Sequence, residues 1–144
     1  MGMRKMFKVG YTQGVFDMFH VGHLNLINRA KEQCERLMVG VNSDVLVQNY
    51  KHKMPVIPER ERIEIIRNMK AVDRAEIVET LDKVELWKQY HFEVVFIGDD
   101  WKGNERWNRT EEELSFHNVS VVYLPYTPNI SSSALVGEIQ NRVE

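Results

Sequence analysis

The chain has 144 residues, a formal net charge of −2 and a hydrophobic share of 43%. This length suits one domain, and the hydrophobic share supports a folded core, which excludes a disordered chain. The near-neutral charge gives no bulk attraction to nucleic acid or anionic membranes, and no apolar run approaches membrane-spanning length. We therefore expect a single cytoplasmic domain over 1–144, with a core over about 7–143, no nucleic-acid partner and no membrane insertion.

Short apolar runs alternate with helical patterns along the chain. The runs that predict strands are 7–14, 36–43, 75–79, 93–98 and 119–125. The patterns that predict helices are about 22–33, 59–70, 81–91 and 131–143. This alternation predicts an α/β fold, a single Rossmann-like domain whose five-stranded parallel sheet carries helices on both faces.

Two further segments bear on this arrangement. Residues 44–58 are expected to form a long, irregular, lysine-bearing loop after the second strand. Cys34, the single cysteine, excludes an intramolecular disulfide and a cysteine-based zinc site, and it falls in a helical pattern that predicts core packing.

Parallel sheets bind ligands at the carboxyl ends of their strands. The segments expected at this edge are the turn at 14–23, the lysine-bearing loop, "GDDW" at 98–101 and "PYTPNISSS" at 125–133. They are rich in Gly, His, Lys, Asp and Ser, and we expect them to face one cleft.

The turn "GVFDMFHVGH" places His20 and His23 at the start of the first predicted helix. A zinc site lacks a third ligand at suitable spacing. A catalytic base would have Asp17 to orient it, but no serine or cysteine lies nearby in sequence. Phosphate binding explains Gly14 and Gly22 as well, because glycines permit close approach of the backbone and a helix N-terminus attracts anions. The alternative is structural: two satisfied polar residues at a helix start.

The wider string resembles the His-x-Gly-His signature of the cytidylyltransferase-like nucleotidyltransferase superfamily. "VGVNSD" (39–44), the lysine-bearing loop, "ER" (61–62) leading to "AVD" (71–73), and the closing "YLPYTPNISSS" follow in the family's order. "IGDDWKG" (97–103) followed by "VVYLP" is most similar to glycerol-3-phosphate cytidylyltransferase.

The resemblance implies transfer of CMP from CTP, with Mg²⁺, to a small phosphorylated alcohol. The expected acceptor is glycerol 3-phosphate, giving CDP-glycerol for cell-surface polymer synthesis and releasing pyrophosphate. The alternatives are adenylyl or cytidylyl transfer to another phospho-alcohol or sugar phosphate, and a non-catalytic nucleotide-binding protein. A homodimer is expected by analogy alone.

The resemblance also implies site residues, none of them a metal ligand. Those matching catalytic positions are His20, His23, Lys51 and Arg62. Those matching nucleotide-binding positions are Gln13, Gly14, Val15, Phe16, His20, His23, Lys53, Asp99, Asp100, Trp101, Tyr126, Thr127, Ile130, Ser131 and Ser132. The structural alternatives are a solvated basic loop for the lysines, an exposed helix charge for Arg62, a turn cap and core packing for "DDW", and helix capping for the serines.

The chain departs from the family where an arginine is expected to hold triphosphate oxygens. Tyr126 stands there, and one hydroxyl cannot replace a bidentate guanidinium. Three accounts are open: Arg106 or Arg109 supplies the charge, the nucleotide is bound more weakly or differently, or the protein prefers another nucleotide or has lost activity.

Overall fold

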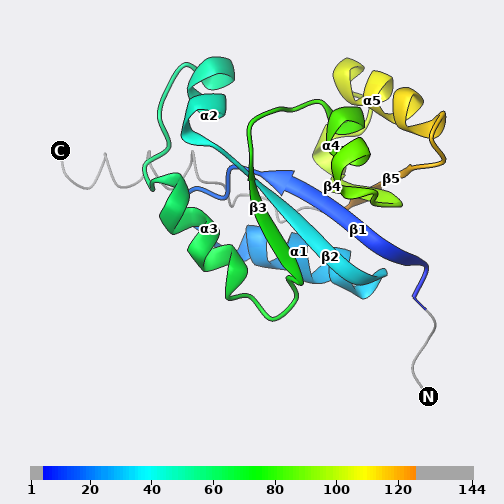
Figure 1. Cartoon of the computed structure of the whole chain (residues 1–144), viewed down its shortest axis with the longest axis horizontal. Coiled ribbons are helices and arrows are strands. Elements are labelled where there is room, and N and C mark those ends of the chain that lie inside the picture. Colours follow the sequence, from blue (N-terminus) through cyan, green and yellow to red (C-terminus); the bar gives the residue numbers. More distant parts are fainter. Residues whose placement is uncertain (1–4, 126–144) are drawn as a thin grey trace.

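A computed structural model describes residues 5–125, in which five parallel strands form one sheet in the order β3-β2-β1-β4-β5 (Figure 1). The strands are β1 (Phe7–Gly14), β2 (Cys34–Asn42), β3 (Arg74–Val78), β4 (Val94–Gly98) and β5 (Ser120–Leu124). The order changes direction at β1, as in Rossmann-like folds. The expected parallel sheet is confirmed; the single domain over all 144 residues stays a prediction.

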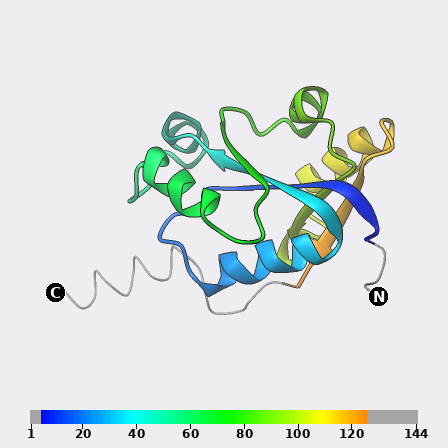
Figure 2. The same cartoon turned by 60° about the horizontal axis from the view of Figure 1, so that its bottom comes forward.

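Helices cover both faces of the sheet, as expected. They are α1 (Val21–Glu32), α2 (Asp44–Lys51), α3 (Glu59–Arg67), α4 (Lys83–Tyr90), α5 (Glu105–Ser115) and the short 3-10 helix η1 (Asp99–Trp101). Figure 2 shows α1, in blue, on one side of the sheet and α4 and α5, in green and yellow, on the other.

Each face of the sheet has its own core. Ile27 of α1 and Ile66 of α3 pack on one face with Val39, while Leu86 of α4 and Leu114 of α5 pack on the other. Strand β2 contributes to both cores because its apolar run is nearly unbroken, the pattern expected of a central parallel strand. The two layers leave the carboxyl ends of the strands open at one edge.

The expected loop at 44–58 is wrong in its first half, because α2 occupies it. The Ser43 hydroxyl caps this helix by accepting a hydrogen bond from the Leu46 N–H, and Val47 is its one buried residue. Helix α5 was not expected either; it is capped by Asn104 and buries Trp107 and Leu114. The one buried side chain of α2 gives too weak a periodicity to reveal a helix, and the mostly charged and polar sequence of α5 obscures its two buried side chains.

Cys34 also differs from its expected place. It begins β2 instead of lying in a helix, although it is buried as a free thiol in the core. Its Sγ lies against Gly10, where an added Cβ would approach it to 2.9 Å.

Tyr11 of β1 packs closely against Gly40 of β2, and this contact positions its hydroxyl group. The Tyr11 ring stacks on Phe92 with centroids 4.5 Å apart, and its hydroxyl lies over Gly40. Burial raises the pKa of the Tyr11 hydroxyl, which therefore stays protonated and donates a hydrogen bond to Gln13 Oε1 at 2.8 Å. A glycine at position 40 leaves the space that this hydroxyl occupies.

We expect Gly40→Ala to destabilise the fold by about 1–3 kcal/mol, because its Cβ would overlap the Tyr11 hydroxyl. Urea unfolding measures the loss. Tyr11→Phe removes the hydroxyl, so the double variant should be less destabilised than the sum of the two single variants by about 0.5 kcal/mol or more. Additive losses would contradict the proposed overlap.

Candidate active site

The buried guanidinium of Arg62 joins three segments at the carboxyl edge. Its Nη1 donates to the carbonyl oxygens of Val15 and Asn42, each at 2.8 Å, and its Nε donates to that of Ile57 at 2.8 Å. Its Nη2 pairs with Asp44 Oδ1 at 2.6 Å, and the Arg62 side chain is 0% exposed. The turn after β1, the junction of β2 with α2, and the segment before α3 therefore meet on one side chain.

Asp17 adds a second link between two of these segments. Its carboxylate accepts hydrogen bonds from the N–H groups of Val56 at 2.7 Å and Ile57 at 2.9 Å. Asp17, the candidate orienting group for an imidazole, thus links the histidine turn to the segment that precedes α3.

The histidine turn has an unusual backbone. Phe16 and Met18 have φ angles of 54° and 49°, in the left-handed region that is costly for residues other than glycine. Phe16 is nevertheless buried in the core, and its ring lies edge-on to His23 with centroids 5.4 Å apart. Core packing therefore supports the conformation that directs His20 and His23.

The two histidines cap α1 and stack on each other with ring centroids 3.8 Å apart. His20 Nδ1 accepts the Gly22 N–H at 3.0 Å, and His23 Nδ1 accepts the His20 N–H at 3.3 Å. A neutral imidazole that accepts at Nδ1 carries its proton on Nε2. The His20 Nε2 is buried, and no partner for it exists among residues 5–125.

Both histidines are held in the neutral form. Burial, and then the charge of His20, lowers the pKa of His23 to about 4, partly opposed by Asp17. Burial also lowers the pKa of His20. At neutral pH the pair can therefore supply N–H donors rather than positive charges. With the N-terminal dipole of α1 beside them, these donors suit an anionic oxygen.

A hollow of about 380 Å³ lies at the same edge, on the face that carries α4 and α5. Of the residues predicted for the site, the hollow is lined by Gln13, Gly14, Lys51 and Trp101. Its other lining residues are Asn42, Tyr50, Leu81, Lys83, Ile97, Arg106 and Trp107. Arg106 thus reaches this hollow, whereas Arg109 is not among the described lining residues.

Amide and hydroxyl side chains connected by hydrogen bonds line part of the hollow. Gln13 Nε2 donates to Asn42 Oδ1 at 2.8 Å and to the Thr80 carbonyl at 3.0 Å, and Asn42 Nδ2 donates to the Tyr50 hydroxyl at 3.1 Å. Sequence reasoning missed Asn42, Tyr50 and Lys83. Asn42 ends β2, and its position near the carboxyl end of the strand predicted over 36–43 was the available signal; Tyr50 and Lys83 had none.

The other predicted residues take varied places. His20, His23, Phe16 and Val15 belong to the turn on the α1 side, where the Val15 carbonyl is bound by Arg62. Asp99 and Asp100 are exposed in η1, and Lys53 is exposed beyond the end of α2. Partial burial, then Lys53, lowers the pKa of Lys51. The residues outside the described range are Tyr126, Thr127, Ile130, Ser131 and Ser132.

Arg62 takes neither of the places expected from the sequence, which were a catalytic position and an exposed helix charge. It is not an exposed helix charge paired with Glu59 or Glu61, because it is buried and pairs with Asp44. With no exposed side-chain surface it does not reach a substrate in this conformation, so its contribution to a site is to position the loops.

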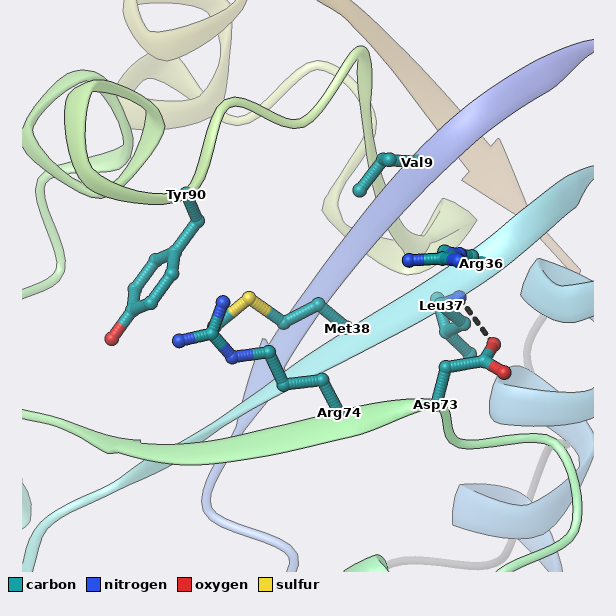
Figure 3. A pocket seen from close by; sticks show the side chains of 7 residues that line it. All are labelled: Val9, Arg36, Leu37, Met38, Asp73, Arg74 and Tyr90. Atoms are coloured by element: carbon teal, nitrogen blue, oxygen red, sulfur yellow. Dashed lines mark hydrogen bonds between the residues drawn. The ribbon is translucent and has the colours of Figure 1, made fainter.

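A second hollow of about 490 Å³ lies at the opposite end of the strands (Figure 3). It is lined by Val9, Arg36, Leu37, Met38, Asp73, Arg74 and Tyr90. Two of its charged groups have partners: Asp73 accepts the Leu37 N–H at 2.8 Å and pairs with Lys31, and Arg74 pairs with Glu76. The amino ends of parallel strands are not where such folds bind ligands, and the histidine turn lies at the other end.

Within residues 5–125, no group of three or more His, Cys, Asp or Glu side chains is arranged to hold a metal ion. None of the helices in this part of the chain is long and apolar enough to cross a membrane.

The cytidylyltransferase-like family matches residues 11–138 of the chain, including the histidine turn and all described lining residues of the carboxyl-edge hollow. The chain belongs to this family. The expected superfamily is thereby confirmed, and the nucleotidyltransferase class of enzyme is supported.

Curated relatives of this family member include bifunctional HldE proteins. The one from Rhodopseudomonas palustris (strain BisA53) is 32% identical over 142 residues, which cover 94% of this chain and 27% of that protein. The one from Caulobacter vibrioides is 36% identical over 95 residues, covering 65% of this chain and 20% of that protein. The chain therefore spans about a quarter of the length of these relatives, whose names do not bear out the specific likeness to glycerol-3-phosphate cytidylyltransferase.

Solved structures share the fold. A lipopolysaccharide core biosynthesis protein from Thermoplasma volcanium superposes with a TM-score of 0.70 at 24% identity, over 84% of this chain and 97% of that chain. Pantothenate synthetase from Thermus thermophilus gives a TM-score of 0.65 at 20% identity, over 94% and 64%. At these identities the likeness supports the Rossmann-like architecture.

We expect the His23 imidazole to titrate near pH 4 instead of 6.5. Because its pKa is lowered by folding, the unfolded chain binds more protons between these values. The stability that neutral His23 contributes is thus full above pH 6.5 and is lost as the pH falls through 4. NMR of the histidine rings, with His23→Asn to assign the signal, measures the midpoint. A midpoint near 6.5 would contradict the buried environment described here.

Proposed function

We propose that this protein transfers a nucleotidyl group from a nucleoside triphosphate to a small phosphorylated acceptor and releases pyrophosphate. The observation that carries this proposal is the buried His20 Nε2, a donor without a partner among the described residues, at the N-terminus of α1. Family membership supports the same class of reaction.

The site suits this chemistry because the nucleophile needs no activation by the protein. A phosphate oxygen of the acceptor is already anionic and attacks the α-phosphorus of the nucleotide, and the bond to the pyrophosphate oxygen breaks. The residues then act by placement and by stabilising charge. In this proposal the Nε2–H groups of His20 and His23 and the N-terminus of α1 bind oxygens of the reacting phosphate and the leaving pyrophosphate.

The proposal includes Mg²⁺ bound with the nucleotide. Residues 5–125 hold no cluster of three carboxylate or histidine ligands. Phosphate oxygens and water would therefore provide most of its ligands, as is usual for this ion, and it would neutralise phosphate charge. The homodimer expected by analogy also remains a proposal.

Two pairs of substrates have support. The similarity to HldE proteins over 94% of the chain favours adenylyl transfer from ATP to a sugar phosphate. The "GDDW" segment favours cytidylyl transfer from CTP to glycerol 3-phosphate. We propose the first pair, because the HldE similarity extends over nearly the whole chain whereas the second rests on one segment.

Pyrophosphate release with ATP or CTP, each paired with a panel of sugar phosphates and glycerol 3-phosphate, tests the proposal. We expect turnover with ATP and a sugar phosphate, and His20→Ala should lower it roughly a hundredfold or more by removing a charge-stabilising donor. His117→Ala is the matched control, since His117 stacks on Trp87 away from the histidine turn. No turnover with any pair, or full activity in His20→Ala, would contradict the proposal.

Thermal unfolding with saturating ATP or CTP compares the nucleotides independently of the acceptor. The better ligand should raise the unfolding temperature more, because binding to the folded state alone stabilises it. A larger shift with CTP would overturn the choice of ATP.

A further inference from the structure

The charged side chains that line the hollow on the α4 and α5 face are all positive among the described residues. Lys51, Lys83 and Arg106 line it, and no carboxylate is among its described lining residues. Within residues 5–125, neither Lys83 nor Arg106 forms an ion pair. These cations come from α2, α4 and α5, so they meet only in the folded chain.

Lys83 is the most informative of the three. It is 5% exposed, its Nζ donates to the Leu81 carbonyl at 2.9 Å, and it lies 5.2 Å from the centre of the Trp107 ring. A buried ammonium without a counter-ion is unfavourable. In keeping with this, burial and then the charge of Arg106 lower its pKa to about 8, with Asp82 opposing. An anion in the hollow would offset this unfavourable burial.

The position of the hollow indicates which substrate supplies the anion. The histidine turn and α1 lie on the other face of the sheet, and Gly14 at the end of β1 borders the hollow. Two substrates can thus approach from opposite faces and meet at this strand end. A volume of about 380 Å³ is near the lower limit for ligand pockets and suits one small molecule better than a nucleoside triphosphate.

We propose that this hollow is the acceptor site, in which Lys83 and Arg106, with Lys51, bind a phosphate monoester and Trp101 and Trp107 contact its carbon skeleton. The inference rests on the proposed function for the acceptor's role, but the anion site itself does not. Lys83 and Arg106 then determine specificity, because they distinguish a phosphorylated acceptor from the corresponding free alcohol. Arg106 has this role here instead of the triphosphate role considered from the sequence.

Inorganic phosphate is the probe for the site, and the three tryptophan indoles report where it binds. Trp101 and Trp107 line the hollow, whereas Trp87 stacks on His117 and is the internal control. In NMR spectra of the full chain labelled with ¹⁵N-tryptophan, phosphate should shift the first two indole signals and leave the third in place.

Single variants test the two cations. Lys83→Met and Arg106→Gln should each weaken phosphate binding about tenfold or more, because each removes a charged hydrogen-bond donor. Lys88→Met and Arg109→Gln remove the same charges from α4 and α5 outside the hollow and should bind phosphate within about twofold of the wild type. If Lys83→Met does not fold, the exposed Arg106→Gln decides the test.

The kinetic constants separate this site from nucleotide binding. In the transfer assay, Arg106→Gln should raise the KM of the phosphorylated acceptor about tenfold or more and leave the KM of the nucleotide within about twofold. An equal rise in the nucleotide's KM would overturn the assignment to the acceptor.

Two outcomes distinguish this inference from the proposed function. Unmoved Trp101 and Trp107 indoles, or wild-type phosphate binding in both Lys83→Met and Arg106→Gln, would overturn the anion site. Phosphate binding that behaves as expected, with no transfer for any substrate pair, would support the anion site and contradict the proposed function.

Discussion

The buried guanidinium of Arg62 is the contact on which the candidate site depends. This side chain of α3 donates to the carbonyl oxygens of Val15, Asn42 and Ile57. It also pairs with the carboxylate of Asp44. A charge this deeply buried is tolerated because its donors are satisfied and one partner is ionised. The loops after β1 and β2 are therefore fixed relative to each other, and both proposed substrate sites border these loops.

Near this contact, the two faces of the sheet carry different polar groups at the carboxyl ends of the strands. The α1 face presents neutral imidazoles at a helix N-terminus, which suits the partial charges of reacting phosphate oxygens. The α4 and α5 face presents full positive charges from Lys83 and Arg106, which suits a dianionic monoester. Gly14 and Gln13 lie where the faces meet, and the hydrogen bonds of Gln13 to Tyr11, Asn42 and Thr80 connect this junction to the sheet. In the proposed function this arrangement brings two charged substrates together, and no acidic side chain is among the described lining residues of the hollow.

The sequence predicted those parts of the fold whose signal is local and repeated. The apolar run of β2 was sufficient because the strand is buried at most of its positions, and apolar residues at helical spacing were sufficient to predict α1. Helix α2 escaped detection because it buries only Val47, and α5 because its two buried side chains stand in a mostly charged and polar sequence. The histidine turn was singled out because the wider string around it resembles the family's His-x-Gly-His signature, whereas the histidine pair alone fits a structural role equally well.

Residues that meet only through tertiary structure could not be predicted in the same way. Lys83 stands in an ordinary helical pattern, and only the position of α5 places Arg106 and Trp107 beside it. Arg62 did carry a signal: it precedes Ile66 by four residues, so it shares the buried face of α3. A charge on an apolar face predicts a buried, bonded arginine, but its partners in the turn after β1 and at the end of β2 are 47 and 20 residues away in the chain.

The most direct test of this account is amide hydrogen exchange in Arg62→Met, with the exposed Arg60→Met on the same helix as control. The account predicts that the amides of Gly22, Leu46 and Ile57, which lie in the three joined segments, exchange about tenfold or more faster together in Arg62→Met, while those of β4 keep their protection. Wild-type protection at these three amides in a folded Arg62→Met would contradict the claim that this side chain holds the site together.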